Sequence, residues 1–136
     1  MDKSKSEIKD LEVIVYARQL QDWVFRVTSK KPKVKQEEFE DGENNGLPAK
    51  YQNSVGTRMQ NYTLDILGSL QNARFLKVKR ADYLQEALAA IACLNECIWL
   101  CFRLKVIRKA SAEEGEALLL NVKRMTLAWR QKTMQG

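Results

Sequence analysis

Apolar residues recur every three or four positions along most of this chain, which is the spacing that one face of an α-helix requires. They are densest between residues 81 and 104, a stretch without Gly or Pro. One apolar stripe there consists of Leu84, Leu88, Ile91, Leu94, Ile98 and Phe102, and a second of Ala90, Cys93, Cys97, Cys101 and Leu104. A helix that is apolar over more than half of its circumference packs against several neighbours. The pattern therefore predicts a central, buried helix.

Three further stretches carry one main apolar face each. Together with the first, they predict helices over about 6–29, 48–77, 79–106 and 111–134. The charged segment 30–47, which contains Gly and Asn, is predicted to be a mobile loop. Because the second and third connections are short, consecutive helices should run in opposite directions. We therefore expect an all-α protein, a single domain over residues 1–136 that folds as an antiparallel up-down four-helix bundle.

Local signals describe the ends and the interiors of these helices. Pro48 suits the first turn of the second helix, and Ser111 and Glu114 are spaced as a capping box for the fourth. Gly56 and Gly68 fall inside the second helix, where each costs about 1 kcal/mol relative to Ala. A helix tolerates this cost where the glycine permits close packing. Close packing at both positions would explain them.

Some apolar residues lie outside the predicted core faces of the first and fourth helices. They are Leu11, Ile14, Phe25, Leu120 and Leu127. A helix in a single bundle needs one apolar stripe, so additional apolar positions imply a further surface to cover, commonly another subunit. We expect these five residues to contact a second copy or another partner.

The chain has a net charge of +6, although the segment 37–43 alone holds five acids. A basic helical protein of this kind suits a polyanionic partner, most often nucleic acid. Lys79 and Arg80 stand at the predicted start of a helix, where the helix dipole disfavours positive charge. We expect phosphate contacts from the cationic residues of this turn and of the fourth helix, namely Arg74, Lys77, Lys79, Arg80, Lys123, Arg130 and Lys132.

Catalytic and metal chemistry finds little support in the sequence. The chain has no His, which removes the commonest general base, and it has no phosphate-binding loop or dinucleotide fingerprint. Cys93, Cys97 and Cys101 have a ligand-like spacing, but no His and few carboxylates stand near them to complete a coordination shell. We therefore interpret the cysteines as packing residues, and we expect no enzyme activity, no catalytic residue, no metal and no cofactor.

Two features bear on the cellular compartment. The first ten residues are charged, with no apolar segment behind them, which predicts a cytoplasmic protein without a signal peptide. The segment 81–104 is long enough to cross a bilayer. However, Asn95 and Glu96 would lie in mid-span, where an acidic side chain costs a few kcal/mol. We expect no membrane association.

Four stretches of the chain resemble a known family. Leu11–Lys33, LEVIVYARQLQDWVFRVTSKKPK, resembles the first helix of the bacterial four-helix-bundle superfamily that includes proteins encoded in ribosomal-RNA intervening sequences. The next three narrow the match. They are PAKYQNSVGTRMQNYTLDILGSLQNARF, RADYLQEALAAIACLNECIWLCFRLKVI and LLLNVKRMTLAWRQK, with a skeleton of Tyr51, Arg58, Arg80 and Trp129. They are similar to the accessory variability determinant (Avd) of diversity-generating retroelements.

This resemblance implies a ring-shaped homopentamer with a basic surface. It also implies that the protein binds RNA or DNA and docks a reverse transcriptase during mutagenic copying of a template RNA (mutagenic retrohoming). Two alternatives remain. One is an RNA-binding four-helix protein of the intervening-sequence type, without a polymerase partner. The other is a bundle that serves as a protein–protein adaptor, with positive charge that only keeps it soluble.

Overall fold

The computed structural model describes residues 2–29 and 47–136, with side chains from Glu12 onward. Four long helices account for most of these residues, and the described part of the chain contains no strand. The predicted all-α class is therefore confirmed. The long helices are α1 (Asp2–Thr28), α3 (Thr57–Phe75), α4 (Arg80–Arg103) and α5 (Lys109–Gln135). Their bounds lie within a few residues of those predicted, except that the second predicted helix starts in two shorter pieces.

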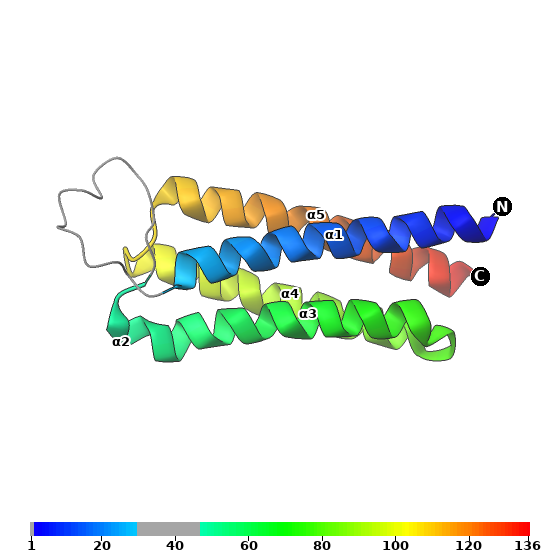
Figure 1. Ribbon diagram of the computed structural model, residues 1–136, viewed down its shortest axis with the longest axis horizontal. Coiled ribbons are helices and arrows are strands. Elements are labelled where there is room, and N and C mark those ends of the chain that lie inside the picture. The colour runs from blue at the N-terminus through cyan, green and yellow to red at the C-terminus, as the bar shows by residue number, and fades with distance from the viewer. Residues whose placement is uncertain (1, 30–46) are drawn as a thin grey trace.

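The four long helices lie lengthwise beside one another (Figure 1). α1 packs against α3 and α5, and α4 packs against the same two helices. Each helix therefore has two main neighbours, and the apolar core fills the space that all four enclose. The start of α1, the end of α5 and the α3–α4 turn lie at one end of the molecule (Figure 1).

The face of α1 that enters the core is wider than predicted. Val13, Leu20, Trp23 and other apolar residues at helical spacing are buried. Ile14, which we placed outside the core as a subunit contact, is fully buried and faces the interior. That prediction was wrong, because α1 lies between two neighbours and so buries an arc rather than a single stripe.

The second predicted helix is interrupted near its start. A single α-helical turn, α2 (Ala49–Tyr51), leads into a π-helical segment, η2 (Gln52–Gly56), before α3 begins. A Cβ on Gly56 would lie 3.1 Å from Leu47 Cδ1, so this glycine does permit close packing. Leu47, which we assigned to the mobile loop, is fully buried there. The rest of that predicted loop, residues 30–46, lies outside the described residues.

Gly68 differs from Gly56. A Cβ built on Gly68 would meet no other atom within 4 Å, so nothing in the described part of the chain requires a glycine there. The prediction of close packing at this position was wrong for the isolated chain. Its helix cost of about 1 kcal/mol is therefore unexplained by the fold.

The first apolar stripe of α4 forms its core face, as predicted. The second stripe is not continuously buried: Cys101 is in the core, Cys97 is half-buried, and Cys93 and Leu104 are exposed. α4 therefore has two neighbours, as α1 has, and is not central. The segment Lys77–Arg103 is long and apolar enough to cross a membrane, but buried helices of water-soluble folds commonly meet the same criterion.

Helix α5 begins at Lys109, two residues before the predicted start. Ser111 therefore lies inside the first turn, and no side chain caps this end, so the predicted capping box is wrong. The apolar spacing of this segment predicts a core face of Leu118, Val122, Met125 and Trp129, but the observed face is rotated, because Leu118, Met125 and Trp129 are half-buried at its edge. The fully buried positions are Ala112, Gly115, Leu119, Val122 and Thr126.

The largest buried side chain determines how closely α1 and α5 approach. Trp23 of α1 is 1% exposed, and its indole ring lies directly over Gly115 of α5. A Cβ on Gly115 would overlap the atoms Cη2, Cζ2 and Cζ3 of that ring. An exposed ion pair between Arg26 and Glu114, 3.0 Å apart, flanks the same contact. A glycine inside α5 is therefore needed to accommodate the tryptophan.

We expect Gly115→Ala to lower the free energy of unfolding by about 1–2 kcal/mol, since overpacking exceeds the gain in helix propensity. Gly68→Ala is the matched control, because its new methyl group meets nothing. It should raise the free energy of unfolding by about 1 kcal/mol. Urea denaturation followed by circular dichroism measures both. Equal changes in the two variants would contradict the packing argument.

Candidate nucleic-acid interface

The predicted phosphate-binding residues cluster around the turn between α3 and α4. We call residues 74–80 the basic turn. α3 ends at Phe75, since Leu76 leaves the helical region with φ −111° and ψ 79°. One 3₁₀ turn, η3 (Lys77–Lys79), then leads directly into α4. The connection is so short that its side chains must crowd at one end of the molecule.

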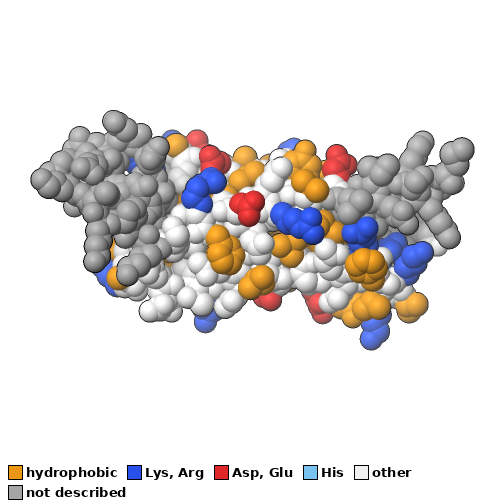
Figure 2. Space-filling view, viewed as in Figure 1, with side chains coloured by type: hydrophobic (Ala, Val, Ile, Leu, Met, Phe, Trp, Pro, Cys, Tyr) orange, Lys and Arg blue, Asp and Glu red, His pale blue; other side chains and the backbone are white. Residues whose placement is uncertain are grey.

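Cationic and apolar side chains are exposed together on the basic turn. Lys77 and Lys79 are exposed, as predicted. Val78 between them is fully exposed, and Phe75 is 69% exposed. Figure 2 shows Lys, Arg and hydrophobic side chains gathered at the end of the molecule where this turn lies. The apolar part of this surface was absent from our sequence interpretation, although the letters FLKVK contain it.

Arg80 does not have the free side chain that we predicted. Its Nε donates a hydrogen bond to the carbonyl oxygen of Ala73 at 2.7 Å, and its Nη2 donates to that of Arg74 at 3.1 Å. These carbonyls belong to the last turn of α3, which leaves acceptors unsatisfied and carries the negative end of the helix dipole. The Arg80 guanidinium also lies over the Trp129 ring of α5, 5.4 Å from its centroid. Arg80 is therefore a structural residue.

The remaining predicted contacts are distributed unevenly. Arg74 is half-buried, with its guanidinium 5.2 Å from the centre of the Phe75 ring. Because Trp129 touches Arg80, the neighbouring Arg130 and Lys132 of α5 lie near the basic turn. Arg130 is half-buried, and its Nε has no partner among the described residues. Lys123 is exposed and lies six residues before Trp129, about 9 Å along the helix axis.

The predicted subunit contacts have different degrees of exposure. Three of them are exposed, as contact residues must be: Phe25 at 40%, Leu120 at 37% and Leu127 at 44%. Their contact with a partner stays a prediction. Ile14 is excluded by its burial, and the side chain of Leu11 lies outside the described residues. Sequence reasoning missed further exposed apolar residues, notably Leu64 at 55%. Leu64 lies two residues before the buried Ile66, so helical spacing places it off the core face.

The cysteines lie at three different depths along α4. The Cys101 thiol is buried and donates to the Met59 sulfur at 3.8 Å, and burial raises its pKa to about 11. Burial also raises the pKa of the half-buried Cys97, and the adjacent Cys93 adds to the rise. No group of three potential metal ligands occurs in the part of the chain that the structure describes. The buried Cys101 fits the packing role that we assigned.

Comparison with known proteins does not identify the chain: no family model, no curated protein and no solved structure matches it.

We expect Arg80→Ala to lower the free energy of unfolding by about 2 kcal/mol, because two carbonyls lose a charged donor. Arg80→Lys should recover only part of this, since a lysine cannot donate to both carbonyls in the same planar geometry. Lys79→Ala, one residue earlier and exposed, should change stability by less than about 0.5 kcal/mol. Thermal and urea unfolding test the three variants. An Arg80→Ala protein as stable as Lys79→Ala would show that Arg80 is not structural.

Proposed function

We propose that this protein is a nucleic-acid-binding accessory subunit of a diversity-generating retroelement. In this role it associates with the reverse transcriptase while template RNA is copied mutagenically. The resemblance of its helical segments to the accessory variability determinant supports this assignment. The copying chemistry belongs to the partner, and this chain supplies a surface that holds nucleic acid.

The observation that carries the proposal is the composition of the basic turn. Lys77 and Lys79 are exposed, and the two ion pairs found among the described residues, Arg26–Glu114 and Lys109–Glu113, involve neither of them. Exposed cations that lack protein partners suit phosphate contacts, which release counterions on binding. The exposed Phe75 ring beside them offers a platform on which an unpaired base can stack. The combination favours single-stranded RNA or DNA.

The proposal includes the finer architecture. Each long helix packs against two others, and the short α3–α4 turn reverses the chain direction, which supports an antiparallel up-down four-helix bundle. The exposed leucines of α5 support a homo-oligomer, and the family resemblance makes it a pentamer. A cytoplasmic location without membrane association goes with this function.

One alternative has a specific observation in its favour. The exposed apolar residues Phe75, Leu76 and Val78 would also suit a protein–protein adaptor, since an isolated valine contributes little to nucleic-acid binding. An RNA-binding protein of the intervening-sequence type would use the same cations without a polymerase. A reverse-transcriptase gene beside this one, with a template and variable repeat pair, would favour the retroelement over both.

We expect the double variant Lys77→Ala, Lys79→Ala to bind a labelled single-stranded oligonucleotide with a weaker salt dependence. Removing two phosphate contacts should reduce the slope of log K against log salt by about 1.4–1.8. Arg80 is left intact, so the turn stays folded. Fluorescence anisotropy at four or more salt concentrations gives the slope.

A matched control removes two charges at the opposite end, with Lys50→Ala and Lys105→Gly. Glycine suits position 105, where φ is 60°. This control should keep the wild-type slope. If the slope of log K against log salt falls by the same amount in both double variants, binding depends on net charge and not on the basic turn. Wild-type binding that ignores salt would exclude a phosphate interface.

We expect the wild-type protein to be a homo-oligomer at micromolar concentration by multi-angle light scattering. Leu120→Asp with Leu127→Asp should yield a folded monomer, because these side chains are already partly exposed and their burial against another copy is lost. Val78→Asp, which also replaces an exposed apolar residue, should leave the mass unchanged. A monomeric wild-type protein would contradict the homo-oligomer.

A further inference from the structure

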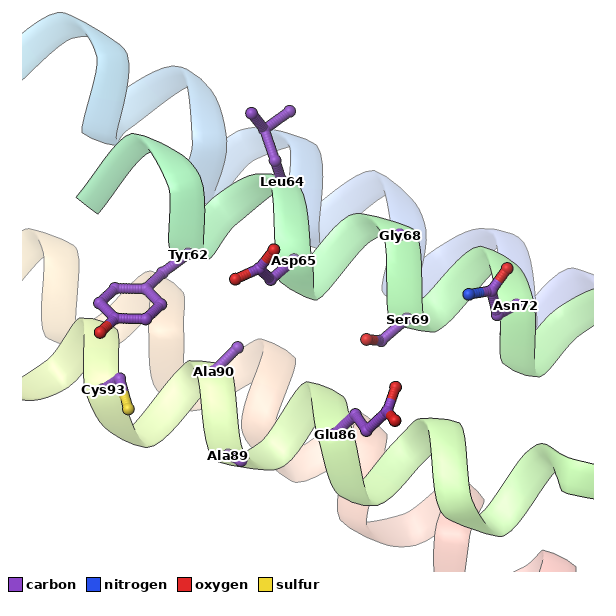
Figure 3. A pocket seen from close by; sticks show the side chains of 10 residues that line it. All are labelled: Tyr62, Leu64, Asp65, Gly68, Ser69, Asn72, Glu86, Ala89, Ala90 and Cys93. Atoms are coloured by element: carbon purple, nitrogen blue, oxygen red, sulfur yellow. The ribbon is translucent and has the colours of Figure 1, made fainter. Parts of the chain in front are cut away.

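A groove of about 530 Å³ runs between α3 and α4, on the side of the molecule away from the core (Figure 3). Its α3 side extends from Tyr62 to Asn72, about 15 Å along the helix axis. Asp65 and Ser69 project into it from α3, and Glu86 reaches toward Ser69 from α4 (Figure 3). An open groove of this length suits an elongated occupant, such as two to three turns of a helix.

The charge of the groove is opposite to that of the protein. Asp65 and Glu86 are both exposed, and neither forms a hydrogen bond or ion pair with a described residue. No Lys or Arg lines the groove, although the chain has 23 basic residues. Carboxylates that become covered must gain a cationic partner to offset their desolvation. The occupant therefore carries positive charge, and nucleic acid is disfavoured here.

Small residues in the wall of the groove would allow another helix to approach its backbone closely. Gly68 lies on the α3 side, and Ala89 and Ala90 lie on the α4 side. Within the protomer Gly68 has no packing role. The loss of helix stability that a glycine causes is therefore unexplained, unless another molecule approaches the backbone at this position. Leu64, 55% exposed, lines the outer edge of the α3 side and offers an apolar contact there. These features match a helix that presents apolar and cationic side chains together.

The chain itself carries such a helix. On the outer surface of α5, Leu120, Lys123, Arg124 and Leu127 are all exposed at the spacing i, i+3, i+4, i+7. We call these four residues the α5 strip. None of them forms an ion pair or side-chain hydrogen bond with a described residue. The strip combines two leucines with two cations, and the groove has two carboxylates with a leucine at its outer edge. The two surfaces are complementary in charge and in apolar character.

We propose that the α3–α4 groove of one protomer receives the α5 strip of a second copy. Asp65 and Glu86 pair with Lys123 and Arg124, Gly68 admits the incoming helix, and the strip leucines pack against Leu64. Because the groove and the strip are different surfaces, the contact is heterologous, and repeating it closes a ring or extends a filament. The inference rests on the proposed homo-oligomer and assigns its interface. It also gives Lys123 a role apart from the basic turn.

A charge-swap experiment tests this pairing. The groove variant is Asp65→Lys with Glu86→Lys, and the strip variant is Lys123→Glu with Arg124→Glu. Each alone should weaken self-association by about tenfold or more, as measured by light scattering over a dilution series. The quadruple variant restores opposite charges across the interface and should recover assembly. A control variant, Glu12→Lys with Asp22→Lys on α1, makes the same charge change as the groove variant and should keep the wild-type mass.

Two further measurements exclude simpler explanations. Gly68→Leu, whose side chain enters open space in the protomer, should fold normally by circular dichroism and still block assembly. An equimolar mixture of the groove and strip variants should assemble beyond either variant alone, because both pairings between unlike copies bring opposite charges together and only the pairings between like copies repel. A groove variant with the wild-type mass, or a quadruple variant that stays monomeric, would overturn the proposal while leaving the homo-oligomer intact. Oligonucleotide binding by the groove variant, measured in parallel, reports separately on the basic turn.

Discussion

The contacts of one side chain, Arg80, hold together the end of the molecule where α3 is followed by α4. Arg80 is the first residue of α4, and its guanidinium donates to two carbonyls at the end of α3 and lies over Trp129 of α5. Three of the four long helices are therefore tied together by one planar cation. This arrangement allows a connection of only four residues between α3 and α4. Such a short connection keeps Lys77 and Lys79 on a rigid support, where cations that repel one another would otherwise spread apart.

The helices could be predicted from the sequence because apolar periodicity is a property of each segment alone. The first stripe of α4 followed directly from it. The width of the buried arc could not be predicted in this way, because it depends on how many neighbours a helix has. Ile14 was placed outside the core, and Cys93 inside it, for this reason. Gly115 was missed because only the fold brings Trp23 over it.

The candidate site illustrates the same limit. The sequence located the cationic cluster, since its members are close along the chain. It could not separate Arg80 from Lys79, because the carbonyl acceptors of Arg80 are backbone groups and Trp129 is far away in sequence. The groove could not be predicted from the sequence either, since Asp65 and Glu86 come from different helices. In the folded protein, positive charge lies at the end of the molecule and a small negative region lies along its side. The two regions therefore differ in sign, so a polyanion and a cationic helix would be attracted to different parts of the surface.

The thiol of Cys93 lies in the wall of the groove, on the solvent side of α4. Burial raises the pKa of the Cys101 thiol to about 11, and it also raises the pKa of the Cys97 thiol. In the folded chain, alkylating reagents should therefore modify Cys93 well before the other two. A helix seated in the groove would cover this sulfur. The alkylation rate of Cys93 in the wild-type protein would therefore measure the fraction of unoccupied grooves. This measurement needs neither a label nor a mutation.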